Sequence, residues 1–163
     1  MKPFLLPLGE VSEPEMLEAF AEQVAALEEG GADGVIIETM TALEEARLAI
    51  QAAKENTGLA VISTMVFDKG PRGFFTMMGV TPEQAVAELL DAGSDVVGSN
   101  CGNGIDVMLE VAGAMRAATD APLLIHSNAG IPTLVKGEIV YPESSEYMAE
   151  RFKTLAEMGV NIV

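Results

Sequence analysis

The chain has 163 residues, 49% of them apolar, so it is long enough and hydrophobic enough to fold around its own core. Its 25 acidic and 9 basic residues give a formal charge of −16. Such a surface repels phosphate backbones and anionic lipids, so we expect neither a nucleic acid nor a membrane as partner. The sequence contains no membrane-length apolar run, signal peptide or second cysteine, and we expect a cytoplasmic protein without an intrachain disulfide.

The first predicted element is a helix that begins after Ser12. Ser12 and Glu15 form a capping-box pattern, which satisfies free backbone amides of the first helical turn. The uninterrupted apolar run at residues 34–38 follows the helix and is typical of a parallel strand buried on both faces. Apolar side chains at helical spacing predict one buried stripe on the helix: Met16, Phe20, Val24 and Leu27.

The same helix–strand alternation continues along the chain. A second helix is predicted after Thr41, with Glu44 as its capping partner. A third helix follows Thr81, where proline occupies the first helical position. The remaining predicted elements are helices over about 104–118, with Asn103 as cap, and about 145–158, and strands over residues 59–63, 95–99, 122–126 and 161–163.

The spacing of these elements indicates the architecture. Asp33, Asp95 and Asn161 occupy equivalent positions after helix-ending glycines, at separations of 62 and 66 residues, so two strand–helix units take about 62 residues. A (β/α)8 barrel has eight units in about 250 residues, which is the same period. An open doubly wound sheet is the alternative, but the first strand lacks the Gly-x-Gly-x-x-Gly motif that usually supports it.

We therefore predict an α/β fold with part of a (β/α)8 TIM barrel. About five parallel strands are expected, corresponding to the fourth to eighth strands of the closed barrel. Residues 1–163 are interpreted as a single incomplete barrel domain, cut at both ends, because the chain opens with a helix and closes on a strand.

Polar residues follow the predicted strands at their carboxyl ends, where barrels place their active sites. Cys101 lies between Gly98 and Gly102, which would let a ligand approach closely. The residues alone leave two interpretations for Cys101, a packed thiol or a functional one. A complete zinc site is not supported, since zinc takes three or four protein ligands and the chain has no Cys-x-x-Cys or His-x-x-x-His. Glu38 either bonds loop amides or binds a cationic group such as a substrate amine.

Three further features stand at these strand ends. His126, the only histidine, is either a hydrogen-bonded structural group or a substrate contact. Asn128 either shapes a turn or contacts the substrate. The segment 67–79 exceeds a usual βα connection, which indicates a functional loop or lid. Its apolar side chains could instead form a satellite core cluster: Phe74, Phe75, Met77 and Met78.

Three motifs, at residues 35–39, 97–101 and 127–130, resemble the homocysteine S-methyltransferase family in order and spacing. That family includes the homocysteine-binding barrel of cobalamin-dependent methionine synthase and betaine–homocysteine methyltransferase. The similarity extends from about Leu6 to Val163. The Asn-Cys-Gly and Asn-Ala-Gly sequences on successive strands make it specific, whereas either one alone would be weak.

The resemblance implies a zinc-dependent transfer of a methyl group to the thiolate of homocysteine, giving methionine. In the family three cysteine thiolates hold the zinc, and the sulfur of homocysteine joins them. By this resemblance Cys101 is one zinc ligand and Glu38 holds the homocysteine amino group. Asn100 and Asn128 are implied as substrate-binding neighbours. The other two cysteines are expected beyond Val163, so we expect this chain alone to bind zinc poorly and to be inactive.

The methyl donor remains open, since methylcobalamin, betaine and S-methylmethionine all serve relatives. With methylcobalamin, a corrinoid protein or domain would be a partner. One alternative is a different barrel enzyme in which Cys101 is only structural. Another is a non-catalytic half-barrel whose exposed strand edges assemble with a partner chain or form a homo-oligomer.

Overall fold

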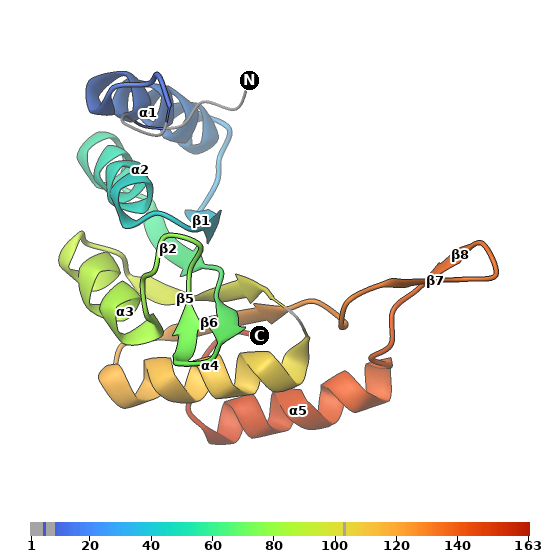
Figure 1. Ribbon diagram of the computed structural model, residues 1–163. Helices are drawn as coiled ribbons and strands as arrows, with labels where there is room; N and C mark the ends of the chain where they lie inside the picture. The colour runs from blue at the N-terminus through green and yellow to red at the C-terminus, as the bar shows by residue number, and fades with distance from the viewer. Residues whose placement is uncertain (1–4, 6–8, 103) are drawn as a thin grey trace.

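The computed structural model describes Leu5, residues 9–102 and residues 104–163 (Figure 1). Four parallel strands form one sheet in the order β1-β2-β5-β6, with bounds Gly34–Met40, Ala60–Met65, Val96–Cys101 and Leu123–Ser127. The helices are α1 (Glu13–Glu29), α2 (Leu43–Asn56), α3 (Pro82–Asp91), α4 (Ile105–Ala118) and α5 (Ser145–Glu157). Two short hairpins complete the fold: β3 (Asp68–Gly70) with β4 (Gly73–Phe75), and β7 (Thr133–Val135) with β8 (Glu138–Val140).

The five helices curve around one face of the sheet and leave the other face open (Figure 1). Strand residues that face the helices are buried and form the core with them, for example Val35, Val61 and Val97. The alternating residues face the open side, where Ile36 is 41% exposed. None of the described helices is both long enough and apolar enough to cross a bilayer. The predicted α/β fold and its parallel strands are therefore confirmed.

The fifth predicted strand is shorter than expected. Residues 161–163 do not form a ladder, and this segment joins the sheet through an isolated parallel bridge between Leu124 and Ile162. The backbone N–H of Ile125 donates to the carbonyl of Ile162 at 2.9 Å. The position and direction of the fifth segment agree with the prediction, but its pairing involves a single residue pair.

The predicted helix starts are mostly correct. Ser12 with Glu15 and Thr81 with Gln84 each form the capping box. The expected cap at Thr41 is wrong, because α2 begins at Leu43 and its preceding residue has no side-chain cap bond. Asn103 lies outside the described residues. The stripe on α1 is only partly covered: Met16 and Val24 are buried, whereas Leu27 is 45% exposed.

Three helices end in the same way. Gly31, Gly93 and Gly159 adopt φ values of 89°, 104° and 87°, the left-handed conformation that glycine accepts without strain. In each case the next residue donates its backbone N–H to a carbonyl five residues earlier, as Ser94 does to Leu89. The predicted glycine caps are therefore confirmed.

The residues after these caps repeat a second contact. The carboxylate of Asp95 accepts the backbone N–H of Val61 in β2 at 2.7 Å. The amide oxygen of Asn161 accepts the backbone N–H of Leu123 in β6 at 3.0 Å. The repeat of two strand–helix units thus places the same side-chain-to-strand bond at Asp95 and at Asn161.

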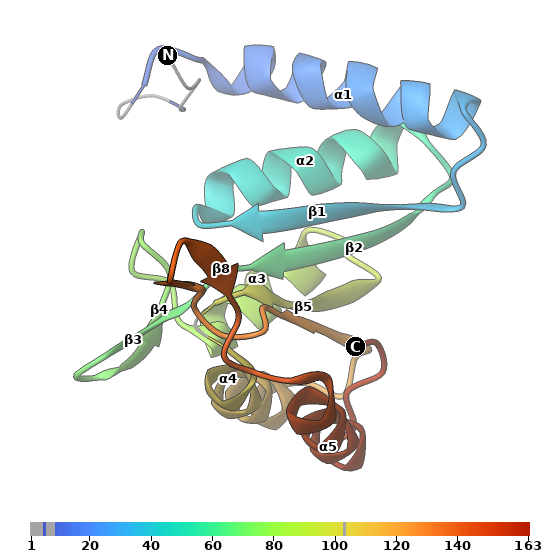
Figure 2. The same cartoon turned by 90° about the vertical axis from the view of Figure 1, so that its right-hand side faces the viewer.

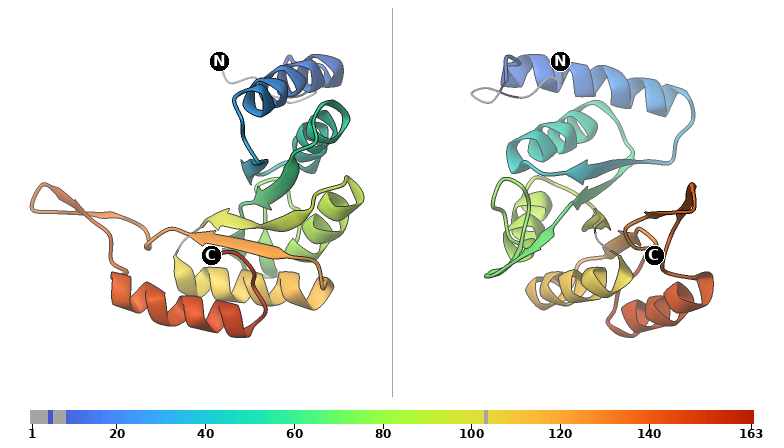
Figure 3. Two further views of the ribbon diagram at one scale, coloured as in Figure 1. Left: turned by 180° about the vertical axis from the view of Figure 1, so that it is seen from behind. Right: turned by 45° about the vertical axis from the view of Figure 1, so that its right-hand side comes forward.

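Both hairpins lie at the end of the sheet toward which the β1 and β2 arrows point (Figure 2). The predicted loop 67–79 contains the β3–β4 hairpin, and Lys69 joins it to Glu110 of α4 at 2.6 Å. Phe74 packs against the core, whereas Met77 is 82% exposed. The β7–β8 hairpin projects from the body of the molecule, as Figure 3 shows from behind.

Candidate active site at the carboxyl end of the sheet

Asn100 is the centre of a polar network that joins three strand ends. Its side chain is 5% exposed, at the end of β5. The amide oxygen of Asn100 accepts the backbone N–H of Thr39 at 2.9 Å and the hydroxyl of Thr64 at 2.8 Å. The amide nitrogen donates to the Thr39 hydroxyl at 2.7 Å and to Cys101 Sγ at 3.5 Å. The network therefore connects β1, β2 and β5 and includes the sulfur of Cys101.

Thr39 and Cys101 both adopt the left-handed backbone conformation, with φ values of 64° and 62°. For residues other than glycine this conformation costs about 1–2 kcal/mol. The two residues meet across the network, with the Thr39 hydroxyl 3.9 Å from Cys101 Sγ. Strained backbone positions of this kind persist only where the surrounding structure holds them in place, and they cluster at functional sites.

The residues after Cys101 bring Asn128 into the same neighbourhood. The backbone N–H of Asn128 donates to the Cys101 carbonyl at 3.3 Å, and its side-chain amide donates to the Gly102 carbonyl at 3.3 Å. Gly102 has a φ of 70°, and a Cβ there would lie 3.2 Å from Met108 Sδ. Asn128 thus contacts the backbone of the Cys101 turn.

Glu38 and His126 lie at the same end of the sheet but do not join the network. Both side chains are exposed. Glu38 directly precedes Thr39, and His126 is the register partner of Asn100 on the neighbouring strand. The structure therefore brings Cys101, Asn100 and Asn128 into contact, while Glu38 and His126 face solvent beside them.

Glu143 caps the helix that follows Cys101. Its two carboxylate oxygens accept the backbone N–H of Ile105 at 2.9 and 3.3 Å, where α4 has no capping side chain of its own. A negative charge at this helix end is favourable because of the helix dipole. A Cβ on Gly104 would lie 2.1 Å from the Glu143 carboxylate, so glycine is required for this approach.

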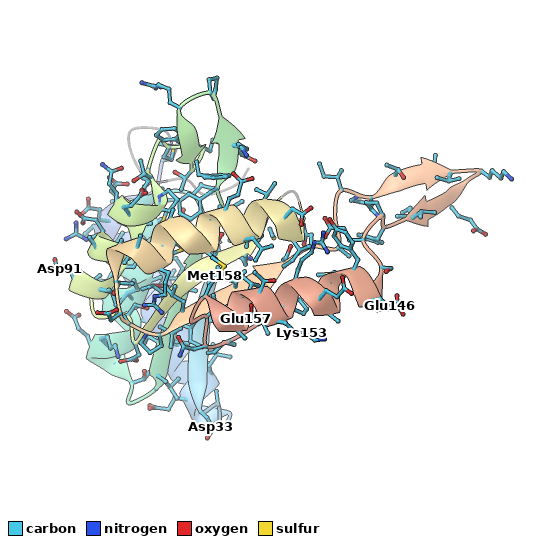
Figure 4. The ribbon with its side chains drawn as sticks, turned by 90° about the horizontal axis from the view of Figure 1, so that it is seen from below. Asp33, Asp91, Glu146, Lys153, Glu157 and Met158 are labelled. Atoms are coloured by element: carbon cyan, nitrogen blue, oxygen red, sulfur yellow. The ribbon has the colours of Figure 1, made fainter. Side chains whose placement is uncertain are left out.

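A second cluster connects the start of α4 to α5. Asp106 accepts the Tyr147 hydroxyl at 2.5 Å and Arg151 Nε at 2.6 Å. These hydrogen bonds, that from Tyr147 first, hold the pKa of Asp106 below its ordinary value, and the bond to Asp106 raises the pKa of Tyr147. The two helices run side by side, with α5 in front (Figure 4). The cluster fixes the base of the segment that carries the β7–β8 hairpin.

Cys101 can act as a thiolate ligand of a metal ion, but it is the single cysteine of the chain. Its sulfur is half-buried and accepts a hydrogen bond from the Asn100 amide N–H at 3.5 Å. Among the described residues no group of three His, Cys, Asp or Glu side chains could hold a metal ion. The described part of the chain therefore offers one ligand that fits zinc, and a complete site would need further ligands.

Parallel strands with outer helices and a thiol at their carboxyl ends define this chain as part of a barrel of the (β/α) type. Residues 3–163 match the family model described as Homocysteine S-methyltransferase. The chain therefore belongs to the homocysteine S-methyltransferase family, as the three sequence motifs predicted.

Solved structures agree on the fold. The apo form of the Escherichia coli homocysteine methyltransferase MmuM has a TM-score of 0.73 and 16% identity, over 94% of this chain and 51% of that one. Its metallated form has a TM-score of 0.68 and 18% identity, over 90% and 46%. The N-acetylneuraminate lyase of Mycoplasma synoviae has a TM-score of 0.57 and 16% identity, over 100% and 51%. The chain thus spans about half the length of these proteins.

Sequence reasoning overlooked three participants in the site. Thr39 and Thr64 stand at predicted strand ends, so their position was a usable signal, but nothing in the sequence shows that both bond Asn100. Glu143 lies 38 residues beyond the helix that it caps, and no local pattern relates the two.

Proposed function

We propose that the protein containing these residues transfers a methyl group to the sulfur of homocysteine, giving methionine, with Cys101 as one ligand of a catalytic zinc. The observation that carries this proposal is the half-buried thiol at a strand end, held in a buried polar network, in a chain of this family. A zinc ion would supply the Lewis acidity that keeps the substrate sulfur ionised near neutral pH.

The neighbouring residues have distinct proposed roles. Glu38 is proposed to bind the homocysteine amino group, and its exposure at the end of β1 supports this role. Asn128 holds the carbonyls of the Cys101 turn. Two further cysteine ligands would come from outside residues 1–163. The 163-residue chain is therefore expected to bind zinc weakly and to show no methyl transfer.

The test uses the protein with every residue that its gene encodes on both sides of this segment. Zinc content and methyl transfer to homocysteine are measured for the wild type, for Cys101→Ser and for Ser94→Ala. Ser94 is a matched control because it is buried in the sheet layer and makes its hydrogen bonds to β2 and β5 away from the thiol. We expect Cys101→Ser to lose zinc and activity together, and Ser94→Ala to retain both. Full zinc content in Cys101→Ser would contradict the proposal.

The methyl donor can be identified in an assay of the same longer protein. Methylcobalamin, betaine and S-methylmethionine are compared as donors, each at saturating homocysteine. Activity only with methylcobalamin would indicate a corrinoid protein or domain as partner.

Association of half-barrels is a second candidate function. The open face exposes Ile36 by 41% and Ile162 by 37%, and β1 has no neighbour on its outer edge among the described strands. An exposed apolar face and a free edge favour pairing with a further chain. Sedimentation velocity over a wide concentration range tests this: a mass that rises with concentration supports association, and a constant monomer mass contradicts it.

A further inference from the structure

Asn100 has no hydrogen-bonding capacity left for a substrate. A side-chain amide can accept two hydrogen bonds at its oxygen and donate two from its nitrogen. The oxygen of Asn100 already accepts from Thr39 N and Thr64 Oγ1, and the nitrogen already donates to Thr39 Oγ1 and Cys101 Sγ. Because Asn100 is also only 5% exposed, a direct substrate contact would require this network to break.

The network also fixes which way the amide points. The backbone N–H of Thr39 can only donate, so the atom of Asn100 that faces it must be the oxygen. The nitrogen must then face the Thr39 hydroxyl and the sulfur of Cys101. A carboxylate in place of the amide would keep both accepted bonds and would lose the donor to sulfur.

Thr39 is held at two points by the same amide. Asn100 binds both its backbone N–H and its hydroxyl, which keeps Thr39 at a φ of 64°. The hydroxyl is thereby held 3.9 Å from Cys101 Sγ. The sulfur therefore has two polar neighbours, the Asn100 amide and the Thr39 hydroxyl. The buried Asn100 side chain determines where both of them lie.

We propose that Asn100 is a positioning residue that holds the Cys101 side chain in one rotamer, directly through its amide nitrogen and indirectly through Thr39. The importance of that rotamer for metal binding rests on the proposed function. The positioning itself can be measured without metal or substrate.

The test is an NMR measurement of the Cys101 Hα–Hβ couplings in the 163-residue chain, since these couplings report the χ1 rotamer. The wild type should show the couplings of one rotamer. Asn100→Asp, which removes the donor to sulfur, and Thr39→Gly, which removes the hydroxyl but accepts a positive φ, should both lose them and show averaged values. Thr64→Val is the control, because Thr64 bonds Asn100 but not the sulfur, and it should keep the wild-type couplings.

Two results would overturn the inference. One is a single, unchanged rotamer in both Asn100→Asp and Thr39→Gly, in variants whose dispersed amide spectra show that they are folded. The other is equal averaging in Thr64→Val, which would indicate general loosening of the strand ends. Failure of the longer protein to bind zinc or to transfer methyl groups would contradict the proposed function but would leave the coupling result unaffected.

Discussion

Replacing Asp95 by alanine should destabilise the chain by about 2 kcal/mol, because the side chain joins two elements of the core layer. One carboxylate oxygen accepts the backbone N–H of Val61 in β2 at 2.7 Å and the Lys54 ammonium of α2 at 2.6 Å. Leaving the part-buried N–H unpaired costs about 1–3 kcal/mol. The ion pair adds only about 0.2–1 kcal/mol, since both its side chains are at least one-third exposed.

Two further variants separate these contributions. Asp95→Asn keeps an oxygen for the Val61 N–H, as Asn161 does for Leu123, and should cost less than about 1 kcal/mol. Asp33→Ala is the matched control, because Asp33 occupies the equivalent place in the repeat and is exposed as Asp95 is, but its side chain makes no hydrogen bond or ion pair to the described residues; it lies at the margin of the molecule in Figure 4. It should change stability by less than about 0.5 kcal/mol.

The assay is urea unfolding followed by circular dichroism, with the free energy of unfolding compared at constant m value. Equal losses in Asp95→Ala and Asp95→Asn would refute the reasoning, since the backbone bond would then contribute nothing. A loss in Asp33→Ala as large as in Asp95→Ala would refute it as well.

The acid dependence of stability provides an independent check on Asp95. The hydrogen bond from Lys54, then that from Val61, lowers the pKa of Asp95 below its ordinary value of 3.8. A lowered pKa means that the unfolded chain binds the proton more readily than the folded chain. The stability that ionised Asp95 contributes is therefore fully present above its ordinary pKa and is lost as the pH falls through its lower pKa in the folded chain. Between the two values Asp95→Ala should therefore show a shallower fall in stability with acid than the wild type.

Three other changes have defined outcomes. Gly98→Ala would place a Cβ 1.9 Å from the Leu124 carbonyl and should prevent folding or cost more than about 3 kcal/mol. Gly113→Ala should instead stabilise α4 by about 0.5–1 kcal/mol, because its Cβ meets only Met158 Cε at 3.5 Å. Thermal unfolding compares the two variants. Thr39→Gly should be more stable than Thr39→Ala by about 1 kcal/mol, because only glycine accepts a φ of 64° without strain; equal urea midpoints would contradict this. Glu143→Ala should cost about 0.5–2 kcal/mol and Glu143→Gln less, since glutamine retains an oxygen for the α4 amide; hydrogen exchange at the first turn of α4 measures the difference.

The fold could be predicted from the sequence because its determinants are local. Glycine at a helix end, followed by Asp95 or Asn161, recurs after about two strand–helix units, and the structure shows the same cap and the same bond to a neighbouring strand at both positions. The wrong cap at Thr41 is displaced by one residue. α2 begins at Leu43, so the N-cap position falls on Ala42, whose side chain has no oxygen to accept a backbone N–H.

The candidate site was predicted in position but not in its contacts. The carboxyl ends of parallel strands meet at one edge of the sheet, so Asn100 and Cys101 were expected there, and Asn128 beside them. Sequence spacing does not state which side chains face each other across a sheet. Thr39 and Asn100 are 61 positions apart, with a helix, a strand, a hairpin and another helix between them, and the two-unit period brings both to strand ends without showing that their side chains meet.

A departure from regular strand geometry brings Thr39 to the network. The pairing of β1 with β2 shifts between Ile37 and Met40, and Thr39 within this irregular step has a positive φ. Regular alternation would place Glu38 and Thr39 on opposite faces of the sheet. The shift instead turns the Thr39 amide and hydroxyl toward Asn100, although β2 lies between their two strands. Bulges of this kind re-aim side chains next to active sites, so the irregular end of β1 and the amide of Asn100 act together to fix the surroundings of the Cys101 sulfur.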